Sequence, residues 1–218
     1  MIVAIANRDG GDAAERLSRI VHADGSASHV APDRLSRNDA LLRDIADTLH
    51  QLCSLHGRHP GVVDHAARSD LHPSAAPWLE QAAAAFSDER AYLIRVSAAA
   101  GPPPGTPGQA ATEAALAAQR HAIDLLARSA RPGCALGAAI AVTLDWPTIR
   151  RPLDAAAIRL GLETVPVTLP PVAQTLRLID TITTEAPIER AMTFGLQQLL
   201  AQHRGLWDLL LARAESRG

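Results

Sequence analysis

Apolar residues recur at steps of three and four along most of this chain, and this spacing constrains the fold more than any other feature. Such steps place side chains on one face of an α-helix. The longest stripe lies near the C-terminus and contains Met192, Leu196, Leu199, His203, Leu206 and Leu210. Similar stripes run from Leu42 to His56 and from Trp78 to Val96. The sequence therefore predicts an all-α protein.

About seven helices are expected, packed in a single bundle-like domain over residues 1–218. Their predicted spans are 12–23, 38–56, a short helix between Pro60 and Pro73, 73–99, 109–130, 134–160 with a bend, and 172 to the C-terminus with a break near Pro187. Residues 24–33 read as a loop, and the proline-rich stretch LETVPVTLPP reads as extended. Residues 1–11 are left unassigned, because their short apolar run has no evident partner strand.

The segment from Cys134 to Trp146 is apolar nearly all round, which predicts a buried helix at the centre of the bundle. Its apolar run CALGAAIAVTL spans about half of the ~20 residues that a bilayer requires, so no membrane span is expected. Pro147 should bend the helix, since an internal proline removes one hydrogen bond.

Charge and composition exclude several classes of function. All 21 basic residues are Arg, and without Lys the chain can form no Schiff base and no Walker phosphate loop. The net charge of -2 and the scattered Arg residues argue against nucleic-acid binding. The Arg and Ala bias indicates a GC-rich bacterial genome. Cys53 and Cys134 form no CxxC motif and no leader precedes them, which favours reduced thiols in the cytoplasm.

The common catalytic motifs GxSxG, HExxH and GxGxxG are absent, so whether the protein is an enzyme stays open at this point. Nine His residues remain of interest, five of them between positions 50 and 72. His203 lies near the centre of the C-terminal stripe and should be buried. His56 lies on the apolar face at the end of its helix. Glu89 is the carboxylate nearest an apolar stripe, and it should need a His or Arg partner.

Several other polar residues are expected to face water. Helical geometry turns Asp47 away from the apolar face of its helix, with His50 beside it. Asp64, within HPGVVDH, is interpreted as a solvated residue at a helix start. Arg150 and Arg151 point about 100° apart and are expected to reach solvent.

The helix predicted over 109–130 carries a small-residue face that should let another backbone approach closely, formed by Ala111, Ala115, Ala118, Ala122 and Leu125. Opposite this face lie Glu113, Arg120 and Asp124, with His121 at the margin. This polar strip is either a wet helix surface or the lining of an internal cavity. The sequence leaves both interpretations open.

Four residues on four predicted helices form a candidate metal site: His56, Glu89, His121 and His203. Their chemistry suits iron or zinc, and a single proximal His would suit haem. The strict diiron pattern fails, because the chain contains no ExxH. In length and helix count the chain is similar to haem-oxygenase-like and ferritin-like folds, a similarity of architecture only.

Two functions follow from these observations. The first is a helical protein that binds a small apolar ligand or a partner helix. In a homo-oligomer, the partner helix would belong to a second copy of the chain. The alternative is a metal- or haem-dependent oxidoreductase that uses the four ligands above. A regulator with a ligand-binding core is a variant of the first function.

Overall fold

The computed structural model describes residues 10–68 and 73–218, and in these ranges the chain forms nine α-helices and no strand. The all-α prediction is confirmed. The helices are α1 (Gly10–Asp24), α2 (Val30–Leu35), α3 (Leu42–His56), α4 (Val62–Ala67), α5 (Ala76–Ala99), α6 (Gln109–Ala127), α7 (Cys134–Arg159), α8 (Val172–Ile182) and α9 (Ala186–Ser216). Most of the unassigned segment 1–11 lies outside the described residues.

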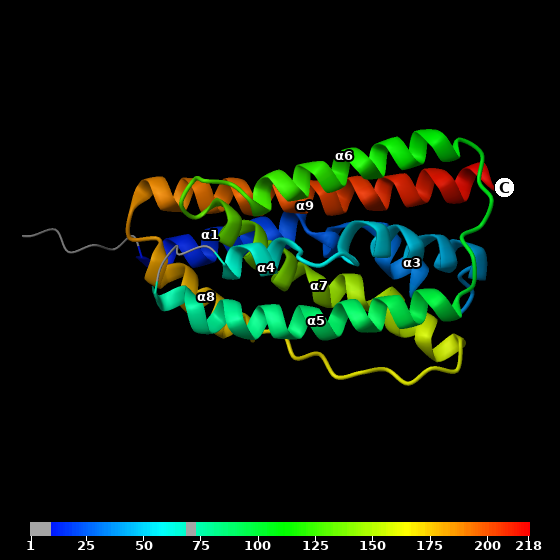
Figure 1. Ribbon diagram of the computed structural model, residues 1–218, viewed down its shortest axis with the longest axis horizontal. Coiled ribbons are helices and arrows are strands. Elements are labelled where there is room, and N and C mark those ends of the chain that lie inside the picture. The colour runs from blue at the N-terminus through cyan, green and yellow to red at the C-terminus, as the bar shows by residue number, and fades with distance from the viewer. Residues whose placement is uncertain (1–9, 69–72) are drawn as a thin grey trace, which may run out of the picture.

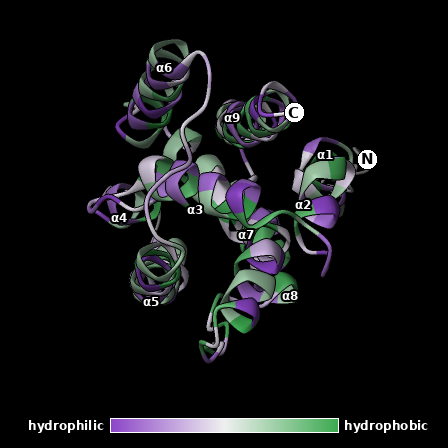
Figure 2. Cartoon of the chain, turned by 90° about the vertical axis from the view of Figure 1, so that its right-hand side faces the viewer, coloured by the Kyte–Doolittle hydropathy of each residue, from purple (hydrophilic) through white to green (hydrophobic). Residues whose placement is uncertain are grey.

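The helices form an elongated bundle around α7. α6 and α9 run side by side along one edge, α5 runs along the opposite edge, and α7 lies between them (Figure 1). The view down the bundle shows α7 in the middle, with α1, α4, α5, α6 and α9 around it (Figure 2). Its burial agrees with this position, since Cys134 to Val142 are all buried. The prediction of a central apolar helix is confirmed.

α7 continues through Pro147 and Pro152 to Arg159 as one helix, 26 residues long. The second half stays helical because it buries its own apolar face: Ile149 and Leu153 are both fully buried. Removing these side chains from water offsets the hydrogen bonds that the two prolines cannot make.

α7 and α9 approach each other more closely than side chains would allow. A Cβ atom on Gly137 of α7 would collide with the Met192 backbone of α9, and one on Gly195 of α9 would collide with the Cys134 backbone of α7. The close approach of backbones therefore occurs here and not on α6. The predicted Ala face of α6 is wrong, because Ala111, Ala115 and Ala118 are exposed.

One difference from the predicted helix list has a simple cause. The segment expected to be a loop contains a 3₁₀ turn, η1 (Ser26–Ser28), followed by α2. His29 caps the start of α2, where its side chain accepts a hydrogen bond from the Ala31 amide. The last helical region divides into α8 and α9, in agreement with the predicted break near Pro187, which lies in the first turn of α9, where a proline is tolerated. The stretch 163–171 is non-helical, as its prolines predict.

Candidate functional site

His203, on α9, is buried as predicted, with 1% of its surface exposed. Its Nδ1 lies 2.6 Å from Oδ2 of Asp145, a carboxylate on α7 that is buried as well. A carboxylate only accepts hydrogen bonds, so His203 donates through Nδ1. This leaves its Nε2 with a lone pair if the ring is neutral.

Asp145 collects three hydrogen bonds. Besides His203, the Ser26 backbone N–H donates to Oδ1 at 2.7 Å, and the Ser26 hydroxyl donates to Oδ2 at 2.6 Å. Ser26 Oγ in turn accepts from Nε1 of Trp207 at 2.8 Å, which leaves the hydroxyl hydrogen for Asp145. The buried carboxylate is thus compensated by donors from η1 and α9.

His56, at the end of α3, meets His203 ring to ring. The two Nε2 atoms lie 3.1 Å apart, and the rings are arranged edge to face with centroids 5.0 Å apart. At this distance the two ring nitrogens share one hydrogen, so one imidazole donates and the other accepts. Burial, and secondly the adjacent His203, hold the pKa of His56 well below its usual value of 6.5. His56 is therefore neutral at neutral pH.

Glu89, on α5, is buried as predicted, and its partner is an Arg. Nη1 of Arg150 lies 2.6 Å and 2.8 Å from the two carboxylate oxygens, and Nε1 of Trp146 donates to Oε2 at 2.8 Å. The Trp146 indole also meets the His56 ring edge to face at 5.4 Å. Glu89 therefore lies behind Trp146 as seen from the imidazole pair.

Arg150 is only 2% exposed, so the expectation that it reaches solvent is wrong. It also donates from Nε to Asp154 and from Nη2 to the Val165 carbonyl, and its guanidinium lies 4.0 Å from the centre of the Tyr92 ring. Burial, followed by the hydrogen bond to Asp154, raises the pKa of Tyr92 to about 12. Arg151 does reach the surface, where it pairs with Asp33.

The four predicted metal ligands are thus divided. His56 and His203 meet, Glu89 is held by Arg150 and Trp146, and His121 is exposed on α6. Among the side chains that the structure describes, no three His, Cys, Asp or Glu residues are arranged to hold a metal ion. The two imidazoles are the part of the predicted set that the fold brings together.

A small cavity of about 40 Å³ lies beside His56, between the end of α3 and helices α4, α5 and α6. Arg58, Arg90, Arg120 and Asp124 are the charged residues in its lining. Because Glu113, His121 and Asp124 are exposed, the polar strip on α6 is a wet helix surface, and Arg120 and Asp124 reach the rim of this cavity.

Arg90 is fixed by Asp64, whose Oδ2 lies 2.9 Å from Nη1. The same oxygen accepts the Gly61 N–H at 2.7 Å, at the start of α4. The expectation that Asp64 faces water is therefore wrong. Its side chain joins the beginning of α4 to α5, and a buried carboxylate is stable there because Arg90 pairs with it.

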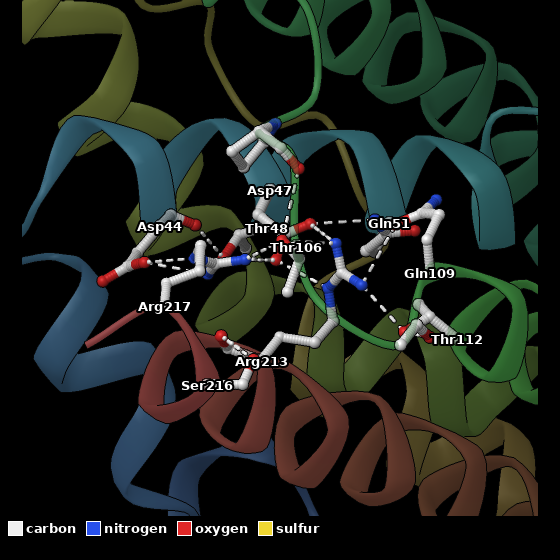
Figure 3. Close-up of polar contacts among 12 residues, drawn as sticks. Asp44, Asp47, Thr48, Gln51, Thr106, Gln109, Thr112, Arg213, Ser216 and Arg217 are labelled. Carbon is white, nitrogen blue, oxygen red and sulfur yellow. Dashed lines mark hydrogen bonds and ion pairs between the residues drawn. The ribbon is translucent and has the colours of Figure 1, made fainter.

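A second buried polar cluster joins α3 to the end of α9 (Figure 3). Asp47 is 0% exposed, so its predicted surface position is wrong. Arg213 donates to both of its carboxylate oxygens at 2.8 Å, and Arg217 donates to Oδ2 at 2.6 Å. Burial alone would raise the pKa of Asp47, but the hydrogen bonds from Arg213, Gln51 and Arg217 outweigh it and lower the pKa.

A groove of about 650 Å³ adjoins this cluster. α2, α3, α9 and the segment between α2 and α3 form this groove. Its apolar lining comprises Val30, Leu35, Ala40, Leu41, Leu210, Leu211 and Ala214. Asp44 and Thr48 contribute to the groove and also appear in the cluster of Figure 3.

Sequence reasoning missed Asp145 and Ser26. Asp145 ends the most apolar run of the chain, CALGAAIAVTLD, and an ionised side chain on a fully buried helix requires a partner. That signal was available. The sequence around Ser26 gave no such signal, because the role of Ser26 depends on the contact between η1 and α7.

These features define an all-α bundle with a buried chain of imidazole and carboxylate groups and a separate apolar groove. The chain belongs to the Family of unknown function (DUF6975), whose model matches residues 21–218. No curated protein and no solved structure matches it. Within the described ranges, no helix combines the length and apolar character needed to cross a bilayer.

Proposed function

We propose that this protein binds a small, uncharged apolar molecule in the groove between α2, α3 and α9. The observation that carries the proposal is the groove itself. Its volume of about 650 Å³ falls within the roughly 300–1,000 Å³ typical of small-molecule sites.

Exposed apolar side chains support an apolar ligand. Val30 is 63% exposed and Leu41 is 52% exposed, and both line the groove. A ligand that covers them removes apolar surface from water, which favours binding.

The charges around the groove favour an uncharged ligand over a charged partner helix. Asp33 pairs with Arg151, Arg37 pairs with Asp39, and Asp44 pairs with Arg217. A charged partner would have to compete with these existing contacts. A neutral ligand leaves them intact.

The wall formed by α3 and α9 is preorganised by the cluster around Asp47. Buried ion pairs with several hydrogen bonds hold the two helices at a fixed separation. A wall that is already ordered loses little conformational freedom when a ligand binds.

The test is a titration with the neutral fluorophore N-phenyl-1-naphthylamine, whose emission rises in apolar surroundings. We expect saturable binding to the wild type and a loss of about tenfold or more in affinity for Ala214→Trp, which fills the groove. Leu125→Trp on α6, a residue that is already 61% exposed, is the matched control. Equal binding to all three proteins, or a wild-type dimer that covers the groove, would overturn the proposal.

The oxidoreductase alternative stays a prediction, as do the bacterial source and the cytoplasmic location. Elemental analysis and an absorption spectrum of the purified protein test the alternative directly. Near-stoichiometric iron, zinc or haem lost on His203→Gln would favour it over the groove.

A further inference from the structure

Asp44, in the first turn of α3, lines the groove between α2, α3 and α9 with a carboxylate whose two oxygens differ. Nε and Nη2 of Arg217 both donate to Oδ1, at 3.2 Å and 2.8 Å (Figure 3). Within residues 10–68 and 73–218, no side chain or backbone group donates to Oδ2. The side chain is 16% exposed. Oδ2 is therefore the oxygen that is left to accept from a ligand.

Other polar side chains of the groove are served by protein partners or by water. Thr48 donates its hydroxyl to the backbone carbonyl of Asp44 at 2.8 Å, and Thr48 is only 2% exposed. Asp39 accepts from Arg37 at both of its oxygens. Asp33 accepts from Arg151 at Oδ1, but its side chain is 67% exposed, so water reaches its other oxygen. Asp44 is the least exposed of these carboxylates.

A ligand in the groove has to provide for Oδ2 of Asp44. The neighbouring lining is apolar and includes Leu41, Leu210 and Leu211. A hydrocarbon lying there removes water from Oδ2 and gives nothing back, and a covered acceptor without a donor is costly. A ligand with a hydroxyl group supplies the donor, and it leaves the pair of Asp44 with Arg217 intact.

The charges around the groove favour a hydroxyl over an ammonium group as this donor. The charge of Asp44 is already compensated by Arg217. Arg34 also lines the groove, is exposed, and is ion-paired with none of the residues that the structure describes. Its positive charge repels a cationic ligand, whereas a neutral alcohol avoids this repulsion.

We propose that the groove binds an apolar alcohol, whose hydroxyl donates to Oδ2 of Asp44 while its hydrocarbon part covers the apolar lining. This inference rests on the proposed function and names the class of ligand. Val30 and Leu41, which are exposed in the groove, pack against the hydrocarbon part. Asp44 fixes the orientation of the ligand, because only its hydroxyl end meets the carboxylate.

The experiment compares biphenylmethanol with its methyl ether by calorimetry on the full chain. The ether has the same rings but no donor, and its extra methyl group favours it in an apolar site. We expect the alcohol to bind about tenfold more tightly, since only the alcohol replaces the water on Oδ2. Equal affinities, or tighter binding of the ether or of biphenylmethylamine, would overturn the inference.

The variant Ala214→Trp separates this inference from the proposed function. If it weakens the alcohol and the ether alike, and the two bind the wild type equally, the groove is a binding site without selection for a hydroxyl. If neither compound binds the wild type, or Ala214→Trp weakens neither, the proposed function fails and this inference fails with it.

Asp44→Asn assigns the selection to one side chain. Its carbonyl oxygen faces Arg217 and its NH₂ group faces the ligand, and that donor serves alcohol and ether oxygens alike. The preference for the alcohol should therefore disappear. Asp33→Asn is the matched control and should keep the preference, as should Thr48→Val, which removes the nearby hydroxyl. Loss of the preference in either control, or its retention in Asp44→Asn, would contradict the assignment. The wild-type comparison needs no variant, so it decides the inference even if Asp44→Asn does not fold.

Discussion

Asp47 of α3 and Arg213 of α9 form a two-point ion pair, in which Nε and Nη2 of the guanidinium each lie 2.8 Å from a different carboxylate oxygen. The residues are 166 positions apart in the chain. Arg217 adds a third contact to the same carboxylate. This pairing closes the end of the bundle where α9 finishes.

Replacing Asp47 by Asn should destabilise the fold strongly. Two guanidinium groups would stay at least partly buried without the charge that compensates them, and breaking a buried pair of this kind costs about 3–5 kcal/mol. The measurement is the free energy of unfolding in urea. Asp39→Asn, which alters an exposed pair with Arg37, should change it little. Similar losses in the two variants would contradict a special role for Asp47.

The same pair predicts a specific dependence of stability on pH. The pKa of Asp47 is lowered by folding from its ordinary value of 3.8, so its stabilising contribution is present above pH 3.8 and is lost as the pH falls through the folded-state pKa. The difference in unfolding free energy between the wild type and Asp47→Asn should therefore shrink below pH 3.8. Urea unfolding at a series of pH values measures it. A difference that stays constant with pH would show that this carboxylate does not contribute in this way.

Gly137→Ala should destabilise the bundle, because the added methyl group meets the Met192 backbone of α9 and forces the two helices apart. The cost should be about 2 kcal/mol or more, exceeding the gain of about 1 kcal/mol in helix propensity. Gly105→Ala is the control, since a Cβ there has no atom within 4 Å. Thermal unfolding compares them, and a Gly137→Ala variant as stable as the wild type would refute the close approach.

Asp145→Asn should lower the free energy of unfolding by about 1.5–3 kcal/mol. The neutral amide cannot accept the charge-assisted hydrogen bonds that the carboxylate accepts from Ser26 and His203. Proton NMR gives a local measurement. The Nδ1–H of His203 should be a slowly exchanging, strongly deshielded signal in the wild type and should shift or disappear in the variant. Asp124→Asn, on an exposed carboxylate, should leave that signal in place.

The helices and the inward position of His203 could be predicted because both depend on local spacing. The apolar stripe that contains His203 places its ring on the face of α9 that packs against other helices. The burial of Glu89 was predicted in the same way, from the apolar stripe beside it. The exact start of a helix was harder to predict, as α3 shows by beginning at Leu42 and not near Asn38.

Asp47 was predicted to be exposed because it points away from the apolar face of its helix, Asp64 because it stands at a helix start, and Arg150 because it diverges from Arg151 by about 100°. Each is buried by a partner on another helix: Arg213, Arg90 and Glu89, respectively. Nothing local in the sequence indicates such a pairing. The groove and the cavity beside His56 likewise depend on which helices become neighbours.

The contact of α7 and α9 at Gly137 and Gly195 has a consequence for movement. Where two backbones touch, neither helix can slide or rotate against the other without first separating. Asp145 and His203 are carried by these two helices, so their spacing is set by this junction. Any adjustment around the imidazole pair must therefore come from the elements that surround it, among them α3, which carries His56, and α6, which carries Arg120.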